Sequence, residues 1–80
     1  MQKTITVTLN QIKTVKDFVS ATTASLCDVD IHSGRYLIDG KSIMGIFSMD
    51  LSKPVEVIIN GESQDDIDAL AEKLIEICEA

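Results

Sequence analysis

Apolar and polar residues alternate in four short stretches of the chain, and this alternation predicts four β-strands. In the first stretch, Ile5, Val7 and Leu9 lie between threonines. A period of two with β-branched residues is typical of a strand with one wet face. The other stretches are residues 28–33, 35–38 and 55–59, and the step Ser33-Gly34 between the second and third indicates a hairpin.

Three further stretches have apolar residues at helical spacing. We expect Thr14 to cap a helix that runs to about Leu26, Ser42 to cap a short helix within residues 42–51, and Ser63 to cap the last helix. The inward stripe of the first helix should be Val15, Phe18, Val19, Thr22 and Leu26. That of the last helix should be Ile67, Leu70, Ala71, Leu74, Ile77 and Cys78. The resulting order is β-α-β-β-α-β-α in one domain, residues 1–80, without a linker or repeat.

Composition narrows the function classes. The chain has 80 residues and a net charge of −6, which argues against nucleic acid and against an anionic membrane surface as partners. No apolar run approaches the length of a membrane span, and the first residues do not resemble a signal peptide. We therefore expect a cytoplasmic protein. Cys27 and Cys78 fit no metal-ligand spacing and are expected to be buried, reduced thiols.

The segment after Ser42 contains too many neighbouring apolar residues for one buried face. Ile43, Met44, Ile46 and Phe47 are nearly consecutive and cover most of the circumference of a short helix. At least two of Ile43, Met44 and Phe47 should therefore be substantially exposed. An exposed Met-Phe-Ile patch is typical of a contact with a protein partner.

Other candidate chemistry is weak. The single histidine, His32, falls on a polar position of the second strand and is expected to be an exposed strand residue. The acidic residues 65, 66 and 68 are interpreted as charge near the start of the last helix and not as a metal site. No nucleophile–base pair or glycine-rich phosphate loop is present, so we expect neither enzyme activity nor a bound metal or cofactor.

The segment Lys41-Ser42-Ile43-Met44-Gly45 resembles the regulatory serine segment of HPr, the phosphocarrier of the bacterial sugar phosphotransferase system. The element order is also that of HPr over nearly the whole chain. This resemblance implies an α+β fold of the open-faced sandwich type. Its four-stranded antiparallel sheet would have the strand order 1-4-2-3, with three helices on one face.

The resemblance fails at the phosphorylated histidine. Members of this family carry Gly-x-His-Ala-Arg-Pro-Ala where the first helix begins, whereas this chain reads Asn10-Gln11-Ile12-Lys13-Thr14-Val15-Lys16. Alignment from the N-terminus puts Thr14 in the place of the histidine and Lys16 in that of the arginine. Counting back from Ser42 puts Gln11 there instead. Neither Thr14 nor Gln11 can form a phosphoramidate.

The resemblance implies a regulatory or adaptor protein related to the phosphotransferase system. It would act by protein contact through the Ser42 helix, with Ser42 as the candidate phosphorylation site. Its interface would contain Ile43, Met44, Phe47 and Lys16, and its partner would be HPr kinase or a transcriptional regulator. The oligomeric state is left open. One relative in this family has glutamine in place of the histidine and acts in carbon catabolite repression through its phosphoserine.

Two alternatives remain at this point. One is a phosphocarrier that uses a residue other than histidine. The other is a small-molecule-binding regulatory module of the ferredoxin-like type, whose first six elements have the same order. A ferredoxin-like sheet would place the first strand between the third and the fourth, so the strand order separates these folds.

Overall fold

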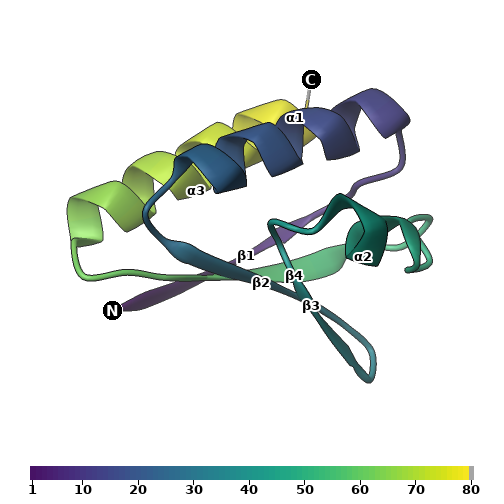
Figure 1. Ribbon diagram of the computed structural model, residues 1–80, viewed down its shortest axis with the longest axis horizontal. Helices are drawn as coiled ribbons and strands as arrows, with labels where there is room; N and C mark the ends of the chain where they lie inside the picture. The colour runs from purple at the N-terminus through teal and green to yellow at the C-terminus, as the bar shows by residue number, and fades with distance from the viewer. Residues whose placement is uncertain (80) are drawn as a thin grey trace.

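The computed structural model describes residues 1–79 and contains four strands and three helices in the predicted order (Figure 1). The elements are β1 (Gln2–Val7), α1 (Ile12–Ala24), β2 (Asp28–Ser33), β3 (Tyr36–Asp39), α2 (Ile43–Phe47), β4 (Val55–Asn60) and α3 (Gln64–Glu79). The strands form one antiparallel sheet with the order β1-β4-β2-β3. This order confirms the predicted α+β fold and rules out the ferredoxin-like arrangement.

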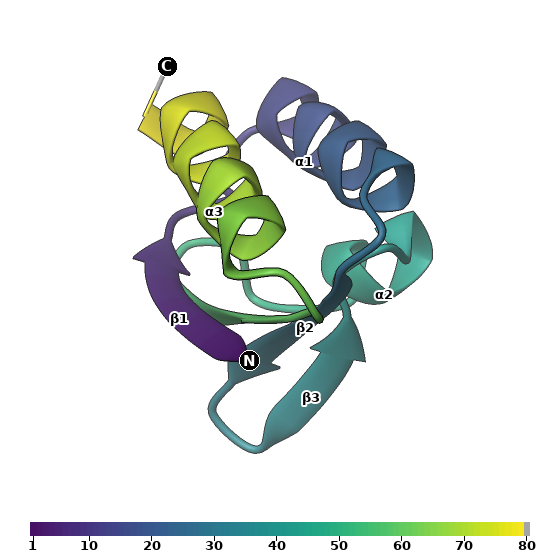
Figure 2. The ribbon, with the colours of Figure 1, turned by 90° about the vertical axis from the view of Figure 1, so that its left-hand side faces the viewer.

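All three helices lie on one face of the sheet, and the core fills the space between the two layers (Figure 2). Alternate residues of each strand point toward the helices, as the period of two predicts. Inward residues of the central strands are fully or almost fully buried: Val29, Ile31, Val55, Val57 and Ile59. The helices cover them with Val15, Phe18, Ile67, Leu70 and Leu74.

The other face of the sheet is open. The inner strand β4 pairs with β1 on one side and with β2 on the other. Ile58 of β4 points to the open face and is half-buried between these neighbouring strands. His32 is exposed there, as predicted, and lies directly opposite Glu56 of β4. The Nδ1 atom of His32 is 3.9 Å from Glu56 Oε2.

The first helix begins and ends earlier than the sequence suggested. Thr14 is not its N-cap: Gln11 has the extended cap conformation, and Thr14 is buried inside the first turn at 8% exposure. The predicted end at Leu26 is also wrong, because the chain becomes extended at Ser25 (φ −87°, ψ 151°). Ser25 Oγ accepts a hydrogen bond from Cys27 N at 3.1 Å and turns the chain toward β2. Leu26 is therefore 95% exposed instead of packing on the helix stripe.

Smaller differences concern the other element ends and the cysteines. The helix within residues 42–51 is confined to Ile43–Phe47. Both cysteines are free thiols, but only Cys27 is buried, whereas Cys78 is half-buried near the end of α3. Partial burial, with a smaller effect of the neighbouring Glu79 charge, raises the pKa of Cys78 to about 11. Within residues 1–79, no helix combines the length and the apolar character that crossing a bilayer requires.

One buried polar contact joins the helix layer to the connection between β3 and α2. Thr22 is fully buried on the inner side of α1, and its hydroxyl donates to the carbonyl oxygen of Gly40 at 2.8 Å. Gly40 packs closely on β2, because a Cβ atom there would lie 2.5 Å from Val29 Cγ1. These contacts fix the chain two residues before Ser42.

We predict that Thr22→Val destabilises the protein by about 1–3 kcal/mol, because it leaves the buried Gly40 carbonyl without a hydrogen-bond donor. Urea unfolding followed by circular dichroism measures the change. Thr23→Val, at the exposed neighbouring position of α1, is the matched control and should shift stability by less than about 0.5 kcal/mol. Equal effects of the two substitutions would contradict this role of Thr22.

Candidate functional site

Ser42 caps the short helix α2, as predicted. Its backbone is extended (φ −104°, ψ 106°), and its Oγ accepts a hydrogen bond from Gly45 N at 3.2 Å. The carbonyl of Ser42 accepts the first helical bond, from Ile46 N at 3.1 Å. The serine oxygen therefore lies at the positive end of α2, beside backbone N–H groups.

Gly45 allows α2 to lie close to the sheet. A Cβ atom at this position would lie 2.8 Å from Ile38 Cγ2 of β3 and 3.2 Å from Ser42 Oγ. Any larger residue would have to push the helix away from β3 or disturb the serine cap. The low helix propensity of glycine is therefore outweighed here by the close approach that it permits.

The apolar side chains of α2 divide between the core and the surface. Ile46 is fully buried and Ile43 is half-buried against the core. Met44 is 78% exposed and Phe47 is 41% exposed. The expectation that at least two of Ile43, Met44 and Phe47 are substantially exposed is confirmed. We call Ser42, Ile43, Met44 and Phe47 the α2 surface.

The chain before Ser42 is anchored by both its main chain and its side chain. Lys41 N donates to Asp39 Oδ1 at 2.9 Å. The Lys41 ammonium donates to the carbonyl oxygen of Ser25 at 3.3 Å, just past the end of α1. Lys41 therefore points toward the end of α1. Its positive charge there stabilises the C-terminal end of the helix dipole.

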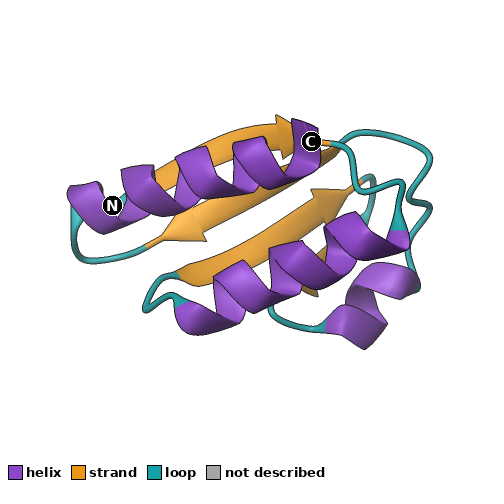
Figure 3. Cartoon of the chain, turned by 90° about the horizontal axis from the view of Figure 1, so that it is seen from above, coloured by secondary structure: helices purple, strands orange, loops and turns teal. Residues whose placement is uncertain are grey.

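The start of α1 forms a second candidate region, at the same end of the molecule as α2 (Figures 1 and 3). Gln11 stands at the N-cap without a side-chain capping bond, and the first turn contains no acidic residue. Ile12 and Lys16 are exposed, and the Lys13 ammonium is 3.3 Å from Asp17 Oδ2. The N–H groups of the first turn, which have no intrahelical acceptor, and the charge of Lys16 give this end a partly positive character.

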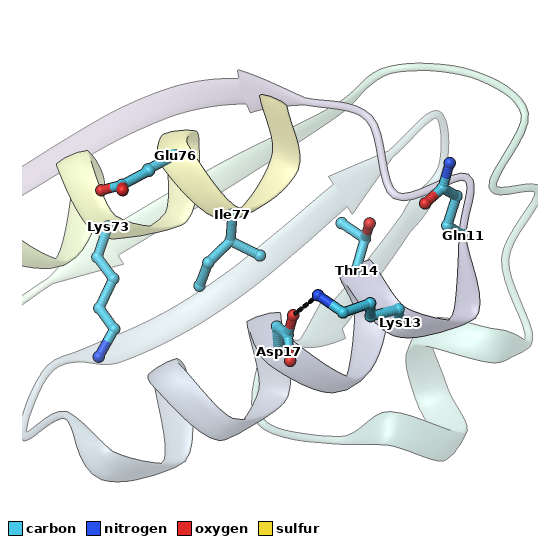
Figure 4. A pocket seen from close by; sticks show the side chains of 7 residues that line it. All are labelled: Gln11, Lys13, Thr14, Asp17, Lys73, Glu76 and Ile77. Atoms are coloured by element: carbon cyan, nitrogen blue, oxygen red, sulfur yellow. Dashed lines mark hydrogen bonds and ion pairs between the residues drawn. The ribbon is translucent and has the colours of Figure 1, made fainter. Parts of the chain in front are cut away.

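A groove of about 520 Å³ runs between this end of α1 and the last turns of α3 (Figure 4). Its walls carry both charges, which limits its preference for any one ion. The lining residues are Gln11, Lys13, Thr14, Asp17, Lys73, Glu76 and Ile77. Of the two residues that could stand in the place of a histidine at this helix start, Gln11 occupies the cap and Thr14 is largely withdrawn from solvent.

The remaining acidic and histidine candidates lie elsewhere. Asp65 and Asp66 are in the first turn of α3, as predicted. Asp68 accepts hydrogen bonds from Gln64 (2.9 Å) and from Lys3 of β1 (3.1 Å), and these bonds hold the pKa of its carboxyl below the usual value. His32 is on the open face of the sheet, which the helices do not cover.

Sequence reasoning missed three contributors to these regions. Ile12 gave a signal, since it is an apolar residue at a helix start with no core position to fill. The hydrogen bond between Thr22 and Gly40 and the contact of Gly45 with Ile38 gave none. Both depend on residues that are distant in sequence and meet only in the folded chain.

No family model and no curated protein matches this sequence. Solved structures similar to this chain include an HPr and a Crh protein. The phosphocarrier protein HPr from Bacillus anthracis str. Ames has a TM-score of 0.74 and 24% identity, covering 98% of this chain and 95% of its own. The catabolite repression protein Crh from Bacillus subtilis, whose structure is a domain-swapped dimer, has a TM-score of 0.64 and 26% identity, covering 91% and 86%. The fold of this chain is therefore HPr-like.

We predict that Ser42→Ala lowers the free energy of unfolding by about 0.5–2 kcal/mol, because the N–H of Gly45 loses its acceptor. Urea unfolding measures the loss. Ser20→Ala, at an exposed position within α1, is the control and should change stability by less than about 0.5 kcal/mol. Unchanged stability of the Ser42 variant would show that the cap contributes nothing.

Proposed function

We propose that this protein is an HPr-like regulatory or adaptor protein of the phosphotransferase system, which acts by protein contact through the α2 surface and not as an enzyme. The observation that carries the proposal is the position of Ser42. It caps α2 directly beside the exposed side chains of Met44 and Phe47, within an HPr-like fold. As part of this proposal, the protein is bacterial and acts in the cytoplasm.

The α2 surface is suited to protein contact. Methionine adapts its shape to a partner, and phenylalanine supplies a large apolar area when it becomes buried. Ile12 and Lys16, both exposed on α1, extend the same end of the molecule with one apolar and one cationic side chain. HPr kinase or a transcriptional regulator would meet this end.

Phosphorylation of Ser42 would control this contact. A phosphate adds nearly two negative charges at neutral pH, and the start of a helix tolerates them. The fold would persist while the charge beside Met44 and Phe47 changes. A partner with a basic surface would then bind better, and one with an acidic surface would bind less well. The similarity to Crh, named for catabolite repression, supports a role of this kind.

Burial of Thr14 weighs against the alternative of a phosphocarrier that uses threonine. A carrier must present its phosphoryl group to two partner enzymes in turn, whereas Thr14 is only 8% exposed within the first turn of α1. Gln11 is accessible but has a carboxamide, which is not nucleophilic. The residues at the start of α1 therefore favour binding over phosphoryl transfer.

We predict that HPr kinase with ATP phosphorylates the wild-type protein on Ser42 and does not phosphorylate Ser42→Ala. Intact-mass and peptide mass spectrometry locate the phosphate. Ser48→Ala, at the other end of α2, is the control and should be phosphorylated like the wild type. Equal incorporation into wild type and Ser42→Ala, or none into either, would contradict the regulatory proposal.

The same assay tests whether HPr kinase contacts the α2 surface. Met44→Asp should slow phosphorylation, because it places a charge in the apolar contact. Leu26→Asp is its match, since Leu26 is also exposed but lies in the connection between α1 and β2. The two variants should differ in rate, and similar rates would place the contact away from Met44.

We further predict that enzyme I with phosphoenolpyruvate leaves this protein unmodified under conditions that fully phosphorylate a histidine-containing HPr. The single histidine, His32, is on the open sheet face and not at the start of α1. Acid-labile phosphate, detected by native gel shift and its loss after acid treatment, would contradict this expectation. A Gln11→His variant tests whether a histidine at the start of α1 in this fold accepts the phosphoryl group from enzyme I.

A further inference from the structure

A second groove lies beside the C-terminal end of α2 and away from the start of α1. It opens between the turn of the β2–β3 hairpin and the segment that joins α2 to β4. Figure 1 shows both segments on its right-hand side. Its volume is about 400 Å³, within the range of small-molecule sites. None of its lining residues also lines the groove at the start of α1.

Two cations face this groove from opposite walls. Arg35 stands in the hairpin turn, and Lys53 stands just before β4. Within residues 1–79, neither has a carboxylate oxygen within 4.0 Å, whereas Lys3 is paired with Asp68 and Lys13 with Asp17. Two unpaired cations thus converge in a protein whose net charge is −6.

Asp50 is the one carboxylate in the lining, and it is hydrogen-bonded to Ser52 of the same loop. Its Oδ1 accepts hydrogen bonds from Ser52 N at 3.0 Å and from Ser52 Oγ at 2.5 Å. Those two bonds, followed by the charge of Lys53, keep the pKa of Asp50 below its usual value. With Arg35 and Lys53 opposed by one aspartate, the groove keeps a net positive charge.

The rest of the lining consists mainly of one aromatic side chain, two apolar side chains and two serine hydroxyl groups. Tyr36 is 69% exposed, so its ring is available as a flat surface. Ile38 and Met49 also line the groove and are partly buried. Ser33 supplies a hydroxyl, whereas the Ser48 hydroxyl already donates to the Gly45 carbonyl at 2.6 Å. The lining therefore suits a ligand that has an anionic group and an apolar body.

Both walls are held in place by short, defined turns. The hairpin has a two-residue loop in which Gly34 has a φ of 57°, a conformation that glycine adopts without strain. In the other wall, the bonds from Ser52 to Asp50 close the turn, and Pro54 restricts the backbone of Lys53. The two cations are thus carried on preorganised backbone, which reduces the entropy lost on binding.

We propose that this groove binds a small organic phosphate, namely a phosphate monoester on a flat, largely apolar ring. A monoester carries close to two negative charges at neutral pH, which matches the two cations. The planar guanidinium of Arg35 forms paired hydrogen bonds with phosphate oxygens, and Lys53 adds a point charge. The ring lies on Tyr36 and above Met49. This site is independent of the proposed role of Ser42.

Phenyl phosphate is the probe, with inorganic phosphate and phenol as its two halves. In a titration of the full chain followed by amide NMR shifts, phenyl phosphate should bind saturably. The shifts should concentrate in residues 33–38 and 48–53. Each half alone should bind at least about tenfold more weakly, since it uses only the cations or only the apolar lining.

Charge variants make the test specific. Arg35→Gln combined with Lys53→Met should weaken binding by at least about tenfold. Lys13→Met combined with Lys16→Met removes the same charge from α1 and should leave binding unchanged. Asp50→Asn keeps an oxygen for the Ser52 bonds but removes the opposing charge, so it should tighten binding, by about threefold. Tyr36→Ala should remove the preference for phenyl phosphate over inorganic phosphate.

Three results would overturn the proposal. The first is a set of shifts that do not saturate or that concentrate at the start of α1. The second is an equal loss of affinity in the two double variants, which would indicate attraction by overall charge only. The third is weaker binding by Asp50→Asn. All the substituted side chains are exposed, and urea unfolding of each variant verifies that the fold is retained.

Discussion

The hydrogen bond from the Thr22 hydroxyl to the Gly40 carbonyl determines where the rest of the candidate site can lie. The chain must leave the sheet at the end of β3 and enter the helix layer, and this crossing buries a backbone carbonyl away from water. Thr22 satisfies that carbonyl from α1, while Gly40 fits against Val29 because it has no side chain. Helix, sheet and crossing are therefore locked together immediately before Ser42. The positions of Ser42, of the α2 start that it caps, and of the exposed Met44 and Phe47 are fixed as a result.

The architecture was largely predictable because it depends on periodic patterns. Alternation in the strands and the helical stripe of α3 both report which side faces the core, and the strand order followed from the resemblance to HPr. Element ends were less predictable, because local signals compete there. Thr14 has the residue type of a cap, yet its place in the first turn makes it part of the buried face of α1. Leu26 continues the helical spacing, yet the extended backbone at Ser25 removes it from the helix. Tertiary position outweighs local propensity in both cases.

The candidate site divides in the same way. Exposure of at least two of Ile43, Met44 and Phe47 was predictable from geometry, since adjacent apolar residues on one short helix cannot share a single buried face; the structure identifies Met44 and Phe47 as the exposed pair. The cap by Ser42 was predictable because it is local. The contact between Gly45 and Ile38, by contrast, joins residues from a helix and a strand at a distance set by the whole fold. The groove between the hairpin and the segment before β4 is of this second kind, since Arg35 and Lys53 are well separated in sequence and converge only once the sheet has formed.

Net charge and local charge lead to different conclusions in this protein. A charge of −6 disfavours a long nucleic acid, because a polyanion interacts with the field of a whole surface. A small ligand interacts mainly with groups within about 8 Å, the screening length at physiological ionic strength. At that range the pairing of each cation matters more than the total. Lys3 and Lys13 are matched with aspartates, and Lys41 is directed to a helix end. Within residues 1–79, Lys16, Arg35, Lys53 and Lys73 have no carboxylate partner, and of these four only Arg35 and Lys53 line the groove between the hairpin and the segment before β4. An acidic protein can therefore exclude nucleic acids and still offer a defined site for a small anion.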